Sequence, residues 1–127
     1  MKAFYSVLLG VFFAATSVMT SAGEMPFSQK MFDELRAAGK PVVVHVHAVW
    51  CETCIEQARV VAPLLSTPEF KDLTLLRADF DKEKALLKSL KVVNRSTFVA
   101  YKGSTEVGRS TGETNKDRIA ALLRKAL

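Results

Sequence analysis

The only two cysteines of this 127-residue chain lie in the segment Cys51-Glu52-Thr53-Cys54, with two residues between them. A run of mostly β-branched residues, Val42-Val43-Val44-His45-Val46, precedes the pair, and an amphipathic segment beginning Ile55-Glu56-Gln57 follows it. This pattern predicts a strand, a turn and a helix, with both cysteines where the helix begins. A C-x-x-C pair in that position, in a chain where helices and strands alternate, indicates a redox-active dithiol.

The predicted position of the cysteines suggests how they would react. The start of a helix offers unpaired backbone N–H groups and the positive end of the macrodipole, so we expect the Cys51 thiol to have a lowered pKa. Its thiolate is the form that attacks a disulfide. Cys54 lies one turn further in, and we expect it to attack the resulting mixed disulfide and release the reduced partner. Trp50 would offer a partner polypeptide an apolar surface beside the nucleophile.

Two other interpretations of the cysteine pair stay open. A purely structural disulfide is one, although a loop this short constrains the unfolded chain little. Half of a zinc site is the other, although structural zinc takes four ligands and the chain has no second C-x-x-C.

The N-terminal residues have the layout of a secretory signal peptide. Lys2 precedes an apolar stretch over 3–15, and a small, polar tail over 16–22 ends in Thr-Ser-Ala, which predicts cleavage after Ala22. An uncleaved membrane anchor is the alternative, but the apolar stretch is short for a span. We therefore expect a signal peptide over 1–22, a domain over 23–127 in the periplasm or secreted, and no stable membrane insertion after cleavage. That compartment favours disulfides.

Charge and composition indicate few other partners. The formal charge of +5 comes from 18 basic and 13 acidic residues scattered along the chain, and no basic run alternates with aromatic residues. Nucleic-acid binding is therefore not indicated. We predict no cofactor.

Hydrophobic periodicity, turn residues and capping residues predict the remaining elements. The first expected helix is Ser28 to Ala38, and the second begins at the cysteine pair and continues after Cys54 to about Val61, where Pro63 ends or kinks it. A short helix begun by Thr67 and Pro68, one capped by Asp81, and a last one capped by Thr114 with Asp117 follow. The expected strands are Val42 to His47, Leu73 to Phe80, Thr97 to Tyr101, and Thr105 to Arg109.

The order of these elements predicts the fold class. Strands joined by crossover helices and followed by a closing hairpin imply an α/β fold, with a mixed central β-sheet of about four strands flanked by helices on both faces.

The segment Trp50-Cys51-Glu52-Thr53-Cys54 after the first buried strand resembles the thioredoxin superfamily, and the likeness covers Phe27 to Leu127. Together with Ser66-Thr67-Pro68-Glu69-Phe70, it is most similar to the C-terminal periplasmic domain of DsbD-type thiol:disulfide reductases and related exported proteins. The resemblance implies a thioredoxin-like fold and thiol–disulfide exchange, with Cys51 as nucleophile and Cys54 as resolving thiol.

One departure from the family lies in Arg95-Ser96-Thr97, where Ser96 stands in place of the family's cis-proline. A non-proline cis bond costs about 2.5–4 kcal/mol, so we expect a trans bond and a reshaped loop. In the family this loop pairs with the substrate backbone, which makes Ser96 and Thr97 candidate substrate-binding residues. It also keeps other ligands from the sulfurs. Ser96 therefore leaves two alternatives, a metal-binding module and an adaptor without turnover.

The other departure is His45, six residues before Cys51, where the family usually holds a buried acid that accepts the resolving thiol's proton. A neutral imidazole could accept that proton, so His45 is a candidate catalytic residue. A hydrogen-bonded core histidine is the alternative. His47 points to the same face of the strand. A bolder hypothesis joins His45, His47, Cys51 and Cys54 as the four ligands of a tetrahedral metal.

The two residues between the cysteines are candidates for tuning the redox potential. The Glu52 carboxylate opposes a thiolate at Cys51, and Glu52-Thr53 lacks the histidine that oxidising family members carry there. We therefore predict a reductase-leaning protein that acts on protein disulfides. It would need a membrane thiol reductase as electron donor.

Overall fold

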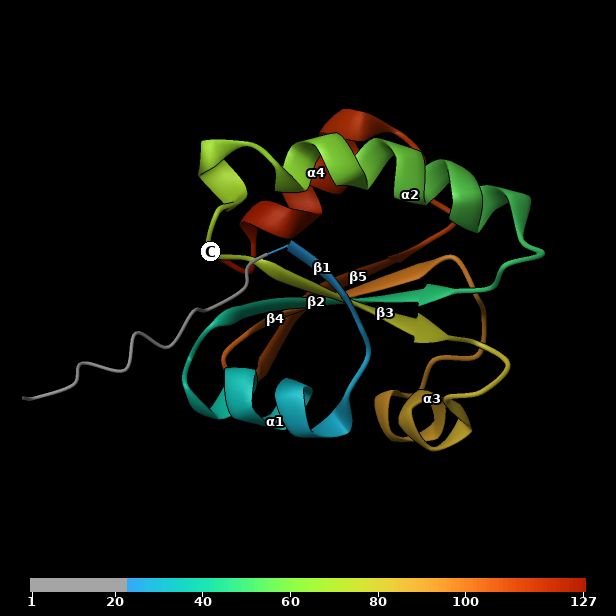
Figure 1. The fold of residues 1–127 in the computed structure, drawn as a ribbon, viewed down its shortest axis with the longest axis horizontal. Coiled ribbons are helices and arrows are strands. Elements are labelled where there is room, and N and C mark those ends of the chain that lie inside the picture. The colour runs from blue at the N-terminus through green and yellow to red at the C-terminus, as the bar shows by residue number, and fades with distance from the viewer. Residues whose placement is uncertain (1–22) are drawn as a thin grey trace, which may run out of the picture.

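The computed structural model describes Gly23–Leu127, so the predicted signal peptide lies outside the described residues. Five strands form one mixed sheet in the order β1-β3-β2-β4-β5, with helices on both faces (Figure 1). The elements in chain order are β1 (Gly23–Pro26), α1 (Gln29–Ala37), β2 (Pro41–His47), α2 (Glu52–Leu65), the 3-10 turn η1 (Pro68–Phe70), β3 (Thr74–Asp79), α3 (Lys84–Leu90), β4 (Thr97–Lys102), β5 (Thr105–Thr111) and α4 (Lys116–Arg124).

Strand β2 is the centre of the sheet, as its sequence predicts. It pairs in parallel with β3 and antiparallel with β4, and every residue from Val42 to His47 is buried. Branched apolar side chains favour such a strand, because both of its faces pack against other elements. The strand delivers the chain directly to the cysteine pair at its carboxyl end.

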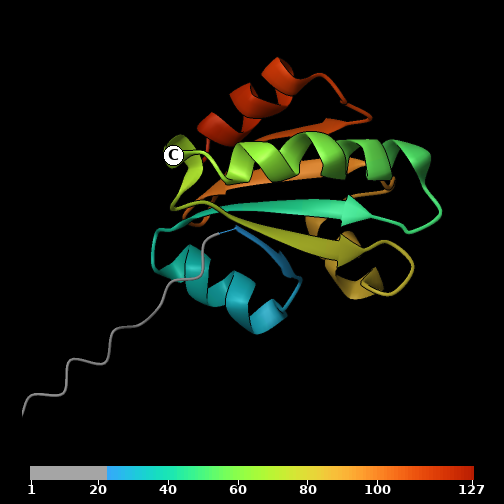
Figure 2. The ribbon, with the colours of Figure 1, turned by 45° about the horizontal axis from the view of Figure 1, so that its top comes forward.

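Helices α2 and α4 cover one face of the sheet and α1 and α3 the other (Figure 2), and an apolar core lies on each face. On one face, α2 and α4 contribute buried residues such as Val61 and Leu123, which cluster with Phe98 of β4. On the other, α1 and α3 contribute Phe32 and Leu87. The predicted α/β architecture, with helices on both faces, is confirmed.

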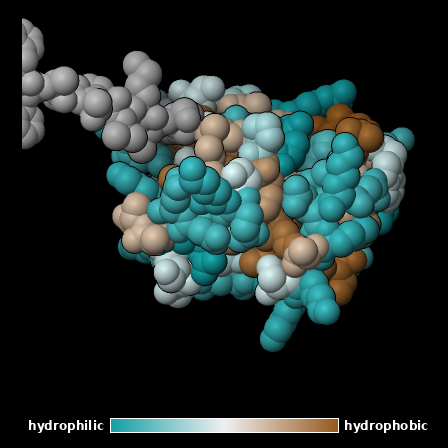
Figure 3. All heavy atoms as spheres, turned by 60° about the horizontal axis from the view of Figure 1, so that its bottom comes forward, coloured by the Kyte–Doolittle hydropathy of each residue, from teal (hydrophilic) through white to brown (hydrophobic). Residues whose placement is uncertain are grey.

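The outer surface of α1 and α3 is mostly hydrophilic, with smaller apolar areas between the polar ones (Figure 3). Among residues 23–127, no helix combines the length and the apolar character needed to cross a membrane.

Strand β1 is an addition to the predicted sheet of about four strands. Its four residues pair in parallel with β3 at the edge of the sheet, with Glu24 opposite Leu75. The segment Gly-Glu-Met-Pro carries neither alternation nor β-branched residues, so local sequence does not indicate it. Pro26 ends the strand, a position that an edge strand tolerates.

Helix α2 does not end near Val61 at Pro63, the first of the two predicted outcomes. The helix continues to Leu65, with Pro63 inside its last turn. Leu64 is buried there and packs in the core beneath α4, together with the partly buried Leu65. This burial offsets the backbone hydrogen bond that proline cannot make.

Two predicted helix starts are also corrected. Asp81 does not cap α3, which begins after Glu83, because the Asp81 carboxylate instead accepts a hydrogen bond from Trp50. Thr114 does not cap α4 either. The N-cap is Asn115, whose side-chain oxygen accepts from the N–H of Arg118.

Candidate active site

Cys51 and Cys54 form a disulfide at the start of α2, with their Cα atoms 5.2 Å apart. Cys51 is the N-cap residue of the helix, and its Sγ accepts a 3.1 Å hydrogen bond from the backbone N–H of Cys54. The sulfur thus occupies the place that a serine or aspartate oxygen takes in an ordinary cap. When the pair is reduced, the same N–H is directed at the Cys51 thiolate, and the helix dipole acts in the same sense.

The two sulfurs differ in depth, as the sequence predicts. Cys51 retains 5% of its surface accessible to solvent, whereas Cys54 retains none. Apolar neighbours surround the pair, with Ala48 fully covered and Phe80 packed beside it. A partner sulfur can therefore reach only Cys51.

The Ser96 side chain covers the pair from the loop before β4. Its Oγ lies 3.1 Å from Sγ of Cys51 and 3.2 Å from Sγ of Cys54. No cis peptide bond occurs within residues 23–127, so the predicted trans bond before Ser96 is confirmed. The φ angle of Ser96 is +61°, a left-handed conformation that a serine rarely adopts.

Hydrogen bonds on both sides hold the Ser96 backbone in place. Its N–H donates to the carbonyl of Val46 at 2.8 Å, a bond that a proline at this position could not make. Its carbonyl accepts from the N–H of Gly112 at 2.9 Å and from the Gln57 side chain at 2.9 Å. These bonds tie the loop to β2, to α2 and to the residue that follows β5.

Gln57 is a site residue that the sequence analysis did not single out. It is fully buried on the inner face of α2, one turn beyond Cys54. Its Nε2 donates to the carbonyls of Ser96 at 2.9 Å and Glu113 at 3.0 Å, and its Oε1 lies 2.8 Å from Nε2 of His45. The available signal was its spacing, because Gln57 shares the helical stripe of Val61 and other core residues and is the polar member of that stripe.

These bonds fix the tautomer of His45. Both hydrogens of the Gln57 amide point at carbonyl oxygens, so its Oε1 must accept, and His45 donates from Nε2. The lone pair therefore sits on Nδ1, which is buried without a partner among the described residues. The ring stacks on Phe98, with centroids 4.3 Å apart.

The environment of His45 disfavours its charged form. Burial, and secondarily the nearby His47 and Arg77, lower the pKa of His45 to about 4, although the Gln57 hydrogen bond acts in the opposite direction. The imidazole is therefore neutral at neutral pH. Its role as proton acceptor for Cys54 stays a prediction, and a pKa this low means that any proton it takes would be held only briefly.

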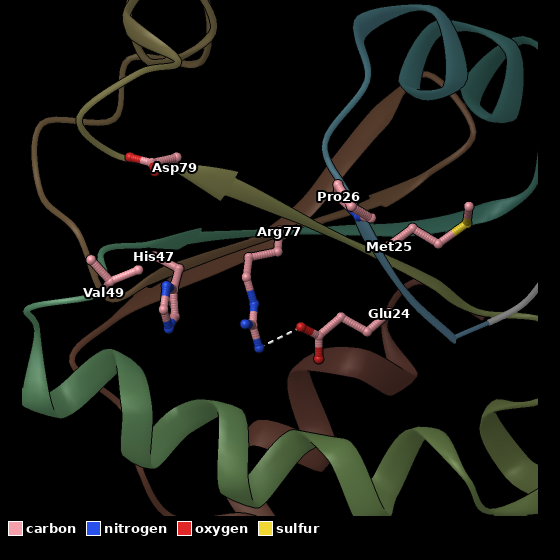
Figure 4. Close-up of a pocket in the computed structure, with 7 residues that line it drawn as sticks. All are labelled: Glu24, Met25, Pro26, His47, Val49, Arg77 and Asp79. Atoms are coloured by element: carbon pink, nitrogen blue, oxygen red, sulfur yellow. Dashed lines mark ion pairs between the residues drawn. The ribbon is translucent and has the colours of Figure 1, made fainter.

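His47 faces a hollow of about 310 Å³ beside the site, at the edge of the sheet near β1 (Figure 4). Glu24 and Arg77 form an ion pair across this hollow, and the Arg77 side chain points toward α2 as the His47 ring does. Burial and the positive charge of Arg77 lower the pKa of His47. Val49 also lines the hollow, but neither cysteine does, so a partner disulfide meets the sulfurs at the surface rather than inside a cavity.

This geometry does not support the four-ligand metal hypothesis. Within residues 23–127, no group of three or more His, Cys, Asp and Glu side chains is placed to hold a metal ion. The rings of His45 and His47 do lie together, 5.5 Å apart, but Nε2 of His45 is committed to Gln57.

Two exposed apolar side chains directly precede the cysteine pair in the chain. Val49 is 79% exposed and Trp50 is 55% exposed. The Trp50 ring is fixed in place, because its Nε1–H donates to Asp81 at 2.7 Å and the guanidinium of Arg95 lies 4.7 Å above it. The residue predicted to contact a partner polypeptide is thus exposed and held rigidly.

The remaining predicted site residues are Glu52, Thr53 and Thr97. Glu52 is exposed in the first turn of α2, next to half-buried Thr53. Thr97 is buried, and its hydroxyl bonds to the carbonyl of Asn94 and to Thr111 at 2.9 Å. Thr97 thus holds the loop together and does not present its hydroxyl to a substrate.

Comparisons with known proteins agree with the fold and the cysteine pair. The family model described as thioredoxin matches residues 24–125. A thioredoxin of Mycobacterium tuberculosis is 33% identical over 72% of this chain and 76% of its own length, and one of Chlamydia trachomatis is 29% identical over 77% and 93%.

Solved structures give the same result. The crystal structure of Trxlp from Edwardsiella tarda superposes with a TM-score of 0.77 at 37% identity, and the match covers 80% of this chain and 98% of that one. A Halobacterium salinarum thioredoxin mutant shares the fold, with a TM-score of 0.72 at 21% identity. With its cysteine pair at the start of α2, this chain belongs to the thioredoxin family and is a thiol–disulfide oxidoreductase.

Proposed function

We propose that this protein is an exported, reductase-leaning oxidoreductase that reduces disulfides in partner proteins. The observation that carries the proposal is the combination of a single slightly exposed sulfur, Cys51, with an exposed and rigidly held Trp50 beside it. An exposed apolar ring next to the one accessible sulfur suits a polypeptide partner better than a small molecule, which would favour an enclosed pocket.

Two features support the reducing direction. Glu52 places a carboxylate next to Cys51 in sequence, which opposes the thiolate and so disfavours the reduced form. A strong oxidant does the opposite and stabilises its reduced form. The two residues between the cysteines also lack a histidine.

Export is supported by the sequence of residues 1–22, which has the layout of a cleaved leader. In an oxidising compartment the pair must be kept reduced by a donor, and a membrane thiol reductase is the class that fits. The proposal therefore includes a role like that of the C-terminal periplasmic domain of DsbD-type reductases.

Insulin-disulfide reduction with dithiothreitol tests the activity on protein disulfides. We expect turnover that disappears in Cys51→Ser, while Cys54→Ser traps a mixed disulfide at Cys51. No turnover by the correctly folded wild-type protein would overturn the proposal and favour an adaptor. A redox titration of the pair then tests the direction, because a potential like that of dedicated oxidases would contradict a reductase.

Export can be tested separately. Residues 1–22 are fused to alkaline phosphatase, which needs an oxidising compartment to form its disulfides. We expect activity from the fusion and its loss when Leu9→Arg interrupts the apolar stretch. An inactive wild-type fusion would contradict export and leave the activity on disulfides untouched.

A further inference from the structure

The Ser96 hydroxyl contacts both reacting sulfurs, in a place where the family carries a proline without any hydroxyl. Its Oγ lies 3.1 Å from Cys51 Sγ and 3.2 Å from Cys54 Sγ. In the disulfide neither sulfur carries a hydrogen, so the one hydroxyl hydrogen of Ser96 is the donor, and the two sulfurs share it. Disulfide sulfur is a weak acceptor, and the arrangement gains little in this oxidation state.

We propose that Ser96 is a further catalytic residue, whose hydroxyl donates a hydrogen bond to the Cys51 thiolate and accepts one from the Cys54 thiol once the pair is reduced. Reduction by a partner dithiol brings two electrons and breaks the S–S bond. One proton of that dithiol stays on Cys54, and the other leaves to solvent. The hydroxyl then accepts from the Cys54 thiol and donates to the Cys51 thiolate, and a hydroxyl can make both of these hydrogen bonds at once.

The backbone around Ser96 is arranged to keep the hydroxyl there. The left-handed φ of +61° directs the side chain toward the sulfurs, and hydrogen bonds with Val46, Gly112 and Gln57 hold the peptide groups on both sides. A rare backbone conformation that its surroundings enforce at a reactive centre is a recognised sign of function.

The local environment strengthens the effect. Ser96 is buried, Cys54 is fully buried, and the apolar side chains of Ala48 and Phe80 pack against the cysteine pair. A charge-assisted hydrogen bond is stronger where water is excluded. Within residues 23–127, the hydrogen bonds that reach Cys51 Sγ come from the Ser96 hydroxyl and the Cys54 N–H, so the hydroxyl is one of two donors to the thiolate.

The inference rests on the thiol–disulfide chemistry of the pair and not on the direction of electron flow. It is tested by titrating the thiolate absorbance of Cys51 in a Cys54→Ser background, alone and combined with Ser96→Ala or Ser96→Gly. We expect both substitutions to raise the thiol pKa by about one unit, a tenfold change in the ionisation constant. Ser110→Ala serves as the matched control, since it removes a buried hydroxyl from β5 that has no partner in the described part of the chain; we expect no shift.

Two variants are needed because glycine also relaxes the left-handed backbone, whereas alanine retains the Cβ. A shift in both supports the hydroxyl. A shift in alanine alone would assign the effect to the backbone and overturn the inference, as would no shift in either or an equal shift in Ser110→Ala. If alanine prevents folding, the glycine variant decides. Insulin reduction by the wild-type protein separates the proposed function from the role of Ser96. If the wild type reduces insulin but the Ser96 variants leave the Cys51 thiol pKa unchanged, only the role of Ser96 is overturned.

Discussion

His45 of β2 donates a hydrogen bond of 2.8 Å from Nε2 to the side-chain oxygen of Gln57 on α2, and both residues are fully buried. The Nε2 of the same Gln57 amide donates a hydrogen bond to the carbonyl of Ser96. A neutral histidine is thereby linked to the loop whose hydroxyl touches the sulfurs. The link joins the central strand, the helix that carries the cysteines, and the loop before β4.

Replacing Gln57 with leucine should destabilise the protein by about 3 kcal/mol. The substitution leaves His45 Nε2 and the carbonyl of Glu113 without their present partner and removes one of the two donors to the carbonyl of Ser96, which keeps the N–H of Gly112. Each buried group left unsatisfied costs roughly 1–3 kcal/mol. Urea denaturation of the oxidised protein measures the change. Gln29→Leu is the matched control, because Gln29 is exposed and bonds only to its neighbour Asp33; it should change stability by less than about 0.5 kcal/mol. Equal effects would contradict the buried network.

Acid should weaken the fold through His45. Its pKa is about 4 in the folded protein, against an ordinary value of 6.5, so between these values the unfolded chain binds a proton that the folded protein does not. Stability is thus fully present above pH 6.5 and is lost as the pH falls toward 4, by about 3 kcal/mol in all.

Urea midpoints at pH 7, 5.5 and 4.5 measure this slope. His45→Gln should flatten it, because glutamine does not titrate. His47→Gln should leave most of the pH dependence of stability in place. The pKa of His47 is also lowered, but His47 is less deeply buried than His45. An unchanged slope in His45→Gln would contradict the assignment to His45.

Local sequence predicts much of the fold where each element carries its own signal. The branched run of β2 and the cysteine pair that follows it specify the centre of the sheet and the start of α2. Strand β1 escapes prediction because its pairing with β3 depends on a partner some fifty residues away and not on its own residues. Pro63 misleads for a related reason, since tertiary burial of Leu64 outweighs a local helix-breaking preference.

The same division holds in the active site. The sequence locates the cysteines, Trp50 and the unusual Ser96, because each stands at a fixed offset from a recognisable element. It does not indicate Gln57, whose three hydrogen bonds reach elements far apart in the chain. Nor does it indicate that Asp81 anchors Trp50 instead of capping α3, because a carboxylate near a helix start suits either role.

Removing the carboxylate next to Cys51 should make the couple more oxidising. Glu52→Gln takes away a negative charge that opposes the thiolate, so the thiol pKa should fall, by less than about one unit because Glu52 is exposed. The shift should shrink at high salt. Glu56→Gln, one turn further along α2, is the control and should have a smaller effect.

A redox titration of Glu52→Gln measures the accompanying change in potential. One pKa unit corresponds to about 30 mV, against about 150 mV between thioredoxin and the strongest oxidants of this chemistry. Glu52 and Ser96 therefore act in opposite directions on the same couple, and neither alone converts a reductase into an oxidase. A more negative potential in Glu52→Gln would contradict the proposed tuning.

Trp50→Ala should impair exchange with proteins far more than exchange with small disulfides. The Trp50 ring is exposed and held between Asp81 and Arg95, so a partner polypeptide can pack on it without ordering it first. Losing such an aromatic contact costs more than about 1.4 kcal/mol, or tenfold in kcat/KM for insulin.

The reaction of the reduced protein with 5,5′-dithiobis(2-nitrobenzoate) provides the comparison, since this small disulfide needs only Cys51. Its rate in Trp50→Ala should stay within about twofold of wild type. Leu127→Ala, which trims an exposed apolar side chain at the end of the chain, should leave both reactions unchanged. If insulin and the small disulfide lose rate equally in Trp50→Ala, the ring acts on the sulfur itself and not on the partner. That result would remove the main support for a polypeptide substrate.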